Sequence, residues 1–272
     1  MIPLFSKPRV ISEKGNSAVF EIEALYPGYG VTVGNSLRRV LLSSLPGSAV
    51  AKMKIKGVAH EFSTIPGVFE DVIQIMLNLK KLRFKIFTDE PQTASLRVKG
   101  EREVKGKDFQ LPSQLELVNK DEHIASLTAK SADLEIEIEV EKGIGYLARE
   151  KRKRGKLNVG EILLDAIYTP VRRVGYQVEN MRVGERTDFD RLSLDIETDG
   201  TITPSEALIQ ASKILLEQFS FINQSIAEQE KPKDLEKAKA KAKTKSRAKV
   251  KPARKRAAAT LNVARAKKAK KK

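Results

Sequence analysis

The sequence contains no cysteine and no tryptophan, and only two of its 272 residues are histidines. Without cysteine the chain can form neither disulfides nor thiolate metal sites. His60 and His123 lie far apart, and nothing around them has the spacing of metal ligands. We therefore expect no metal site and no cofactor.

Long apolar runs are also missing. No segment approaches the ~20 apolar residues that a membrane-spanning helix needs. Residues 1–10, MIPLFSKPRV, lack the long apolar core of a secretory signal. We therefore expect a cytoplasmic protein that does not contact a membrane. The hydrophobic fraction of 40% is nevertheless enough for one or two domains with a real core.

The positive charge is concentrated at one end of the sequence. Residues 231–272 hold 19 Lys+Arg and 2 Asp+Glu, whereas residues 1–230 hold 32 and 33. The net charge of +16 thus comes from a cationic tail on a nearly neutral body. Because the tail has few large apolar side chains to bury, we expect it to be disordered in isolation. Its candidate nucleic-acid-binding residues are Lys239, Lys241, Lys243, Lys245, Arg254, Lys255 and Arg256.

Three segments alternate apolar and polar residues, which indicates half-buried strands in antiparallel sheets. They are AKMKIKG (51–57), DLEIEIEVEKG (133–143) and RLSLDIETDGTI (191–202). The glutamates of the second segment alternate uniformly. This favours a solvated sheet face over a catalytic pair, because a catalytic acid needs an apolar pocket.

Three other segments predict helices, at about residues 35–45, 70–82 and 203–226. The second, EDVIQIMLNLKKL, begins with acidic residues and ends with lysines, as the helix dipole favours. In the third, Thr203 is the predicted N-cap, Pro204 takes the first helical position and Glu206 completes a capping box. With the strands, these helices predict an α+β fold.

The third predicted helix carries more apolar surface than one core-facing stripe of about 100°. Its apolar positions are Leu208, Ile209, Leu215, Leu216, Phe219, Ile222 and Ile226. One explanation is a helix buried on most sides by its own chain. The other, which we favour, is a helix that contacts both its own sheet and a partner chain.

Three glycines precede the first predicted helix in GYGVTVGNSLRRVLLSSLPG (28–47). Their spacing matches neither the dinucleotide-binding pattern nor the P-loop, so turns and close packing are favoured over a phosphate site. A helical wheel gives a packed face of Leu37, Val40, Leu41 and Leu45, and an outer side of Arg38, Arg39 and Leu42. The outer side fits either a solvated face or an arginine-flanked interface anchor.

Three long segments resemble the bacterial RNA polymerase alpha subunit, N-terminal domain. They are GYGVTVGNSLRRVLLSSLPGSAV (28–50), GVAHEFSTIPGVFEDVIQIMLNLKKL (57–82) and LLDAIYTPVRRVGYQVENMRVGERTDFDRLSLDIETDGTITPSEAL (163–208). The resemblance covers about residues 1–228. It implies a dimerisation subdomain, with helices on an antiparallel sheet, formed by residues 1–46 plus 170–230. It also implies an inserted, mainly-β subdomain of residues 47–169.

The resemblance further assigns roles to residues. It implies a homodimer formed by the first and last helices, with candidate residues Leu37, Val40, Leu41, Leu208, Leu215, Phe219 and Ile222. It implies a beta-subunit contact through Arg38, Arg39 and Leu42. It places Arg182 and Arg186 near the contacts with the large subunits.

The implied function is that of the alpha subunit of DNA-dependent RNA polymerase, a scaffold that nucleates assembly of the beta and beta-prime subunits for transcription. The whole enzyme is a nucleotidyltransferase, but we expect no catalytic residue and no small-molecule substrate in this chain, because no carboxylate cluster for magnesium is evident. The alternative function is a DNA-compacting basic protein with a dimeric globular body.

Two features depart from the family pattern. After residue 230 we expect no room for the family's usual C-terminal DNA-reading module. The basic tail stands in its place, and we expect it to bind DNA non-specifically in the nucleoid. The run REKRKRGK (149–156) is interpreted as a solvated loop in preference to a nucleic-acid contact.

Overall fold

The structure, a computed structural model, describes residues 4–152 and 160–230. The described chain divides into two units between residues 216 and 217, inside its last helix. The helices are α1 (Tyr29–Ser43), α2 (Val72–Leu79) and α3 (Pro204–Glu230), with single 3-10 turns η1 (Gly106–Asp108) and η2 (Arg149–Lys151). Helices and antiparallel sheets together confirm the predicted α+β class.

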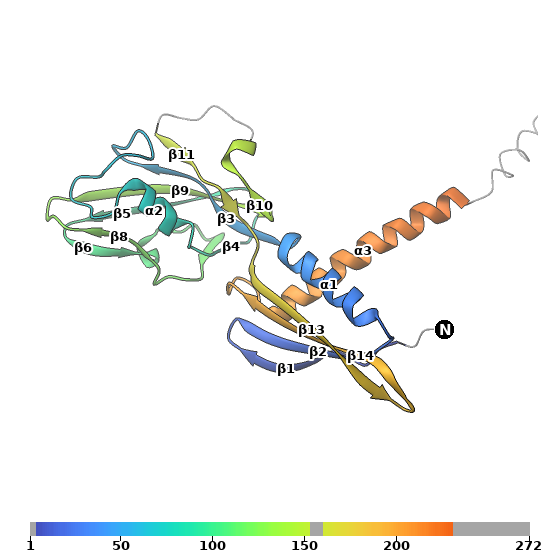
Figure 1. Ribbon diagram of the computed structural model, residues 1–272. Helices are drawn as coiled ribbons and strands as arrows, with labels where there is room; N and C mark the ends of the chain where they lie inside the picture. Colours follow the sequence, from blue (N-terminus) through green and yellow to red (C-terminus); the bar gives the residue numbers. More distant parts are fainter. Residues whose placement is uncertain (1–3, 153–159, 231–272) are drawn as a thin grey trace, which may run out of the picture. The chain divides into compact units, whose positions relative to one another are not determined.

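One four-stranded antiparallel sheet combines the two ends of the body. Its strand order is β1-β2-β14-β13, with bounds Arg9–Lys14, Ser17–Leu25, Arg186–Thr198 and Val171–Val183. The predicted alternation in β14 is confirmed, since Leu192, Leu194 and Ile196 are fully buried. Helix α1 packs across β13 and β14 (Figure 1). Segments 160 residues apart in sequence therefore share one core.

A second antiparallel sheet, of order β11-β3-β9-β5, organises the middle of the chain (Figure 1). Its strands are β3 (Pro46–Ile55), β5 (Gln92–Lys99), β9 (Asp133–Ile144) and β11 (Glu161–Leu163). Three two-stranded sheets accompany it: β4–β7 (Phe84–Ile86, Leu115–Leu117), β6–β8 (Arg102–Lys105, His123–Leu127) and β10–β12 (Tyr146–Leu147, Ala166–Ile167). The second sheet, β4–β7, β6–β8 and α2 enclose a core whose residues run from Val50 to Leu164.

The outer face of β3 and β9 carries paired charges. Lys52 Nζ lies 2.8 Å from Glu139 Oε2, and Lys56 Nζ lies 3.0 Å from Glu135 Oε2. The glutamate row is therefore a charged, partly exposed sheet face, as the sequence indicated. Ion pairs that are this accessible to water contribute little stability.

Two helices start as the sequence predicts and one does not, while α1 and α2 end at Ser43 and Leu79, before the predicted residues 45 and 82. The capping box of α3 is confirmed, because Thr203 Oγ1 accepts the N–H of Glu206 and the Glu206 carboxylate accepts the N–H of Thr203. Helix α2 begins after Asp71, whose carboxylate accepts the N–H of Gln74. The predicted start of the first helix near residue 35 is wrong, since α1 begins at Tyr29.

Candidate assembly surfaces

The start of α1 is held by a carboxylate from a distant strand. Asp190 lies in β14 and is buried, and its Oδ2 accepts the N–H groups of Gly28 and Gly30, each at 2.9 Å. The first N–H groups of a helix attract an anion because they lack partners within the helix. Asp190 supplies that anion within the chain, which argues against a phosphate site at these glycines.

The glycines of this stretch lie inside or at the edge of α1 and serve close packing. A Cβ on Gly30 would stand 2.7 Å from Val178 Cγ1. A Cβ on Gly34 would stand 2.8 Å from Leu192 Cδ1 and 2.9 Å from Tyr176 Cδ2. Contacts below 3.0 Å are repulsive, so α1 approaches the sheet this closely because both positions lack a side chain. The predicted loop before the helix is thus the first part of the helix itself.

The outer side of α1 is only partly as predicted. Arg39 is exposed. Arg38 is also exposed, but its Nε donates a hydrogen bond to the carbonyl of Val174 in β13 at 3.3 Å. Leu42 is half-buried and packs on the core beneath the helix, which corrects its placement on the outer side. The wheel missed this contact because it gives directions around an axis and not what lies beside the helix.

The residues assigned to pairing differ in their exposure. Leu37 and Leu41 are buried in the chain's own core, and Val40 is half-buried against it. These three side chains therefore contact this chain itself. Leu208 and Leu215 of α3 are half-buried against the same core, to which Ala207 and Ala211 of α3 also belong.

The largest exposed apolar surface on a helix is on α3. In residues 204–216, Ile209 and Leu216 are 54% and 67% exposed. In residues 217–227, the exposed apolar residues are Phe219 (62%), Phe221 (69%), Ile222 (53%) and Ile226 (53%). Phe221 was missed by the sequence reasoning, because it falls outside the seven-residue spacing of the stripe. A run of large exposed apolar residues is typical of a protein interaction surface.

Arg182 and Arg186, from the third resembling segment (163–208), lie at the end of the β13–β14 hairpin. Arg182 Nε donates to the carbonyl of Gly184 at 2.8 Å. The guanidinium of Arg186 lies 5.7 Å from the ring centre of Tyr26 and 5.2 Å from that of Phe189. It also binds Asp188 with two hydrogen bonds, which lower the pKa of that carboxyl. Arg186 is thus oriented by its own surroundings, a cation between two aromatic rings.

The sequence reasoning missed two exposed phenylalanines in the second resembling segment (57–82). Phe62 and Phe69 are 76% and 78% exposed. They lie outside regular elements, where no periodicity could reveal their exposure. Their segment is attached to β8, since Phe69 N–H donates to Ser126 at 2.9 Å and Glu70 Oε2 accepts the N–H of Ser126 at 2.6 Å.

His123 strengthens this attachment. Its Nε2 lies 2.8 Å from Glu70 Oε1, and its Nδ1 lies 3.1 Å from Glu103 Oε1. Because carboxylates only accept, both bonds form when both ring nitrogens carry protons. The bond to Glu70 raises the pKa of His123, burial opposes this, and the bond to Glu103 adds to it. The described residues contain no group of three His, Cys, Asp or Glu that could hold a metal ion.

Two arginines of the basic run at 149–156 form ion pairs within the chain. Arg149 Nη1 lies 3.1 Å from Glu61 Oε1, and its N–H donates to Asp165 Oδ1 at 2.9 Å. Arg152 is 9% exposed and lies 2.8 Å from Glu141 Oε1. The interpretation as a solvated loop is therefore wrong for Arg152, whereas Arg149 is exposed as expected, and residues 153–156 lie outside the described residues.

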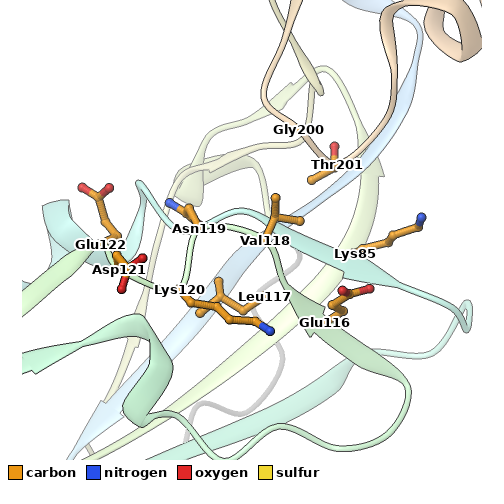
Figure 2. Close-up of a pocket in the computed structure, with 10 residues that line it drawn as sticks. All are labelled: Lys85, Glu116, Leu117, Val118, Asn119, Lys120, Asp121, Glu122, Gly200 and Thr201. Atoms are coloured by element: carbon orange, nitrogen blue, oxygen red, sulfur yellow. The ribbon is translucent and has the colours of Figure 1, made fainter. Parts of the chain in front are cut away.

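A wide-mouthed cavity of about 710 Å³ lies between the 116–122 segment and the turn at Gly200 and Thr201 (Figure 2). Its charged lining residues have both signs: Lys85, Glu116, Lys120, Asp121 and Glu122. The lining offers no nucleophile paired with a base, and its openness leaves charged groups in water. It therefore does not resemble a catalytic pocket.

The comparisons with known proteins agree on one family. A family model described as RNA polymerase Rpb3/RpoA insert domain matches residues 53–169. The "DNA-directed RNA polymerase subunit alpha" of Limosilactobacillus reuteri is 47% identical, over 79% of this chain and 70% of the relative. The subunits so named from Oceanobacillus iheyensis and Roseiflexus sp. are each 47% identical, over 79% and 78% of this chain and 69% and 65% of the relatives. The chain belongs to the DNA-directed RNA polymerase alpha subunit family.

This membership confirms the resemblance that the three segments carried. In the alpha-subunit chain described here, the insert match spans the last three residues of β3, then α2, and β4 to β12. The tail residues assigned to nucleic-acid binding, Lys239 to Arg256, lie outside the described residues. No helix in the described part of the chain is both long and apolar enough to cross a bilayer.

Proposed function

We propose that this alpha-family chain is the homodimeric scaffold on which the beta and beta-prime subunits of a DNA-dependent RNA polymerase assemble in the bacterial cytoplasm. The observation that supports self-pairing most directly is the exposed apolar face of α3. The relatives of this chain are named as RNA polymerase subunits, which favours this role over that of a DNA-compacting protein. In this proposal the polymerase chemistry belongs to the large subunits, and the alpha chain supplies no catalytic residue.

The spacing of apolar residues on α3 fits pairing with another helix. Leu208, Leu215, Phe219, Ile222 and Ile226 follow spacings of seven, four, three and four residues. Such a pattern repeats every 3.5 residues on average, as in helices that pack side by side along a seam. The first two side chains are half-buried by the chain itself, while the last three are more than half exposed. A second copy of the chain would remove these three from water.

Arg39 supports a contact with the beta subunit. It is exposed on α1 and forms no ion pair within the described residues. Arginine is enriched at the centres of protein interfaces, where its fork can bind a carboxylate or a carbonyl of the partner. Arg38 is held by Val174, so we place the main contact on Arg39.

Arg39→Ala is expected to weaken capture of the beta subunit without affecting the dimer. Loss of a central interface arginine costs about 2 kcal/mol or more, which is roughly thirtyfold in affinity. Reconstitution with purified beta subunit, followed by gel filtration, measures the capture. Arg97→Ala is the matched control, because Arg97 is also an exposed arginine but lies on the outer face of the second sheet. Equal capture by both variants would contradict the role of Arg39.

We also propose that residues 231–272 bind nucleic acid through phosphate contacts alone. The segment holds 19 cations against 2 acids and has no aromatic residue to stack on bases. Lysine and arginine on phosphates position a protein without reading sequence. The proposal gives the tail an anchoring role near the promoter and no sequence preference.

The tail should give DNA binding a steep salt dependence. If about 8 of its charges neutralise phosphates, the log–log salt slope is about −7, and a fourfold rise in salt weakens binding roughly 10⁴-fold. Fluorescence anisotropy on two duplexes of different sequence, with the full chain and with residues 1–230, measures this. Equal affinity of the two proteins at low salt would remove the tail from DNA binding. A strong preference for one duplex would contradict a contact limited to phosphates.

A further inference from the structure

An ion pair joins the end of α2 to the turn from which α3 starts. Arg83 Nε lies 3.4 Å from Asp199 Oδ2. The Arg83 side chain is 24% exposed and that of Asp199 is 5% exposed. Arg83 belongs to the segment that matches the insert domain, whereas Asp199 follows β14 of the sheet that supports α1. The pair therefore links the two parts of the fold.

The Arg83 side of this link is rigid. Its Nη1 donates to the carbonyl of Lys80 at 3.0 Å and to that of Leu82 at 3.3 Å, which closes the end of α2. Its backbone N–H donates to Asn119 Oδ1 at 2.7 Å, and its carbonyl accepts the N–H of Val118 at 2.9 Å. Burial lowers the pKa of Arg83, and the charge of Asp199 opposes this. Arg83 is thus attached to the end of α2 through its guanidinium and to the 116–122 segment through its backbone.

The Asp199 side is equally well defined. Asp199 Oδ1 accepts the N–H of Thr201 at 2.9 Å and its hydroxyl at 2.6 Å. The Asp199 N–H donates to the carbonyl of Pro170 at 2.9 Å, where the chain enters β13. A side-chain oxygen that bonds two residues ahead fixes a turn of the backbone. Asp199 therefore sets the turn that precedes the N-cap Thr203.

Beside this link, a wide-mouthed cavity lies between the two parts of the fold. Val118 to Glu122 form one side of the 710 Å³ cavity, and Gly200 and Thr201 form the other (Figure 2). Open water between two surfaces contributes no apolar burial, which is the main source of rigid packing. The ion pair lies beside this cavity. Arg83 is hydrogen-bonded to the lining residue Asn119, and Asp199 is hydrogen-bonded to the lining residue Thr201.

We infer that Arg83 and Asp199 form a latch, an ion pair that fixes the insert (residues 53–169) relative to the turn that precedes α3. The latch is a positioning device, since neither residue needs to touch a partner. It acts within one chain and does not depend on the proposed function. If that function holds, the latch also sets where the insert stands relative to the helix proposed for pairing.

The test measures a distance across the latch in the full chain. Because the chain has no cysteine, cysteines introduced at the exposed positions Lys107 and Lys14 would be its only thiols. Spin labels there, in chains diluted with unlabelled protein, give a distance distribution by pulsed electron resonance. Arg83→Gln, Asp199→Asn and the double variant are compared with the parent. Glu139→Gln is the control, since it removes an ion pair of β3 and β9 away from the cavity.

Each single variant is expected to roughly double the width of the distance distribution, because the insert can then move about its connections to the first sheet. The double variant should broaden it no further, because both changes remove one interaction. Glu139→Gln should leave the width unchanged. Unchanged widths in both single variants would overturn the inference, and so would equal broadening by Glu139→Gln. Circular dichroism verifies that each protein is folded, and Asp199→Asn alone decides the question if Arg83→Gln does not fold.

Discussion

Replacing Ile222 by aspartate is expected to turn the self-associated chain into a folded monomer. Ile222 is 53% exposed in a single chain, so a carboxylate there remains hydrated while the chain is alone. In the proposed dimer it would be buried without a partner charge. That costs about 4 kcal/mol, or roughly a thousandfold in Kd. Light scattering and analytical ultracentrifugation measure the mass.

The choice of position matters for this experiment. Leu215 belongs to the same apolar stripe but is half-buried against the chain's own core. A charge there would therefore disturb folding as well as pairing. Gln224→Asp is the matched control, because it adds the same carboxylate to an exposed position on another side of α3. A monomeric parent, or an Ile222→Asp protein that still pairs at micromolar concentration, would contradict the proposed dimer.

Gly34→Val is expected to cost more stability than any surface substitution on the same helix. The Cβ alone would stand 2.8 Å from Cδ1 of the fully buried Leu192 and 2.9 Å from Cδ2 of Tyr176. Overpacking of this kind costs about 3 kcal/mol. For a body of this size the melting temperature should fall by roughly 10 °C. Thermal unfolding of residues 1–230, followed by circular dichroism, measures the change.

Asn35→Val isolates the packing effect. Asn35 is the exposed neighbour of Gly34 on α1, so valine there carries the same low helix propensity without meeting the sheet. Its stability should change by less than about 0.5 kcal/mol. If Gly34→Val and Asn35→Val have the same melting temperature, the close approach of α1 to Leu192 and Tyr176 does not depend on the missing side chain at Gly34.

What the sequence could and could not predict depends on how far apart in sequence the interacting residues lie. The strands through Met53, Ile136 and Leu194 were predictable, because alternation is a local pattern and all three side chains are buried as expected. The capping box at Thr203 was predictable for the same reason. The start of α1 was not, because its anion is Asp190, which is 160 residues away in sequence from Gly30. Glycines without that partner are typical of a loop.

The candidate surfaces show the same division. The stripe on α3 follows from periodicity, and Phe219 and Ile222 are exposed as a partner contact would require. The contact between Arg38 and the carbonyl of Val174 depends on how α1 crosses β13, which no local pattern contains. The latch between Arg83 and Asp199 was missed because each residue belongs to a segment interpreted separately.

The bond from Gly30 to Asp190 also has a consequence for synthesis on the ribosome. At roughly 5–20 residues per second, the 160 residues between them take about 10–30 s to make. During that time α1 has neither its anion nor β14 to pack against. The core from Val50 to Leu164 is contiguous in sequence and emerges whole within this interval. The insert can therefore fold first, while the first 45 residues wait for the strand that completes their own core.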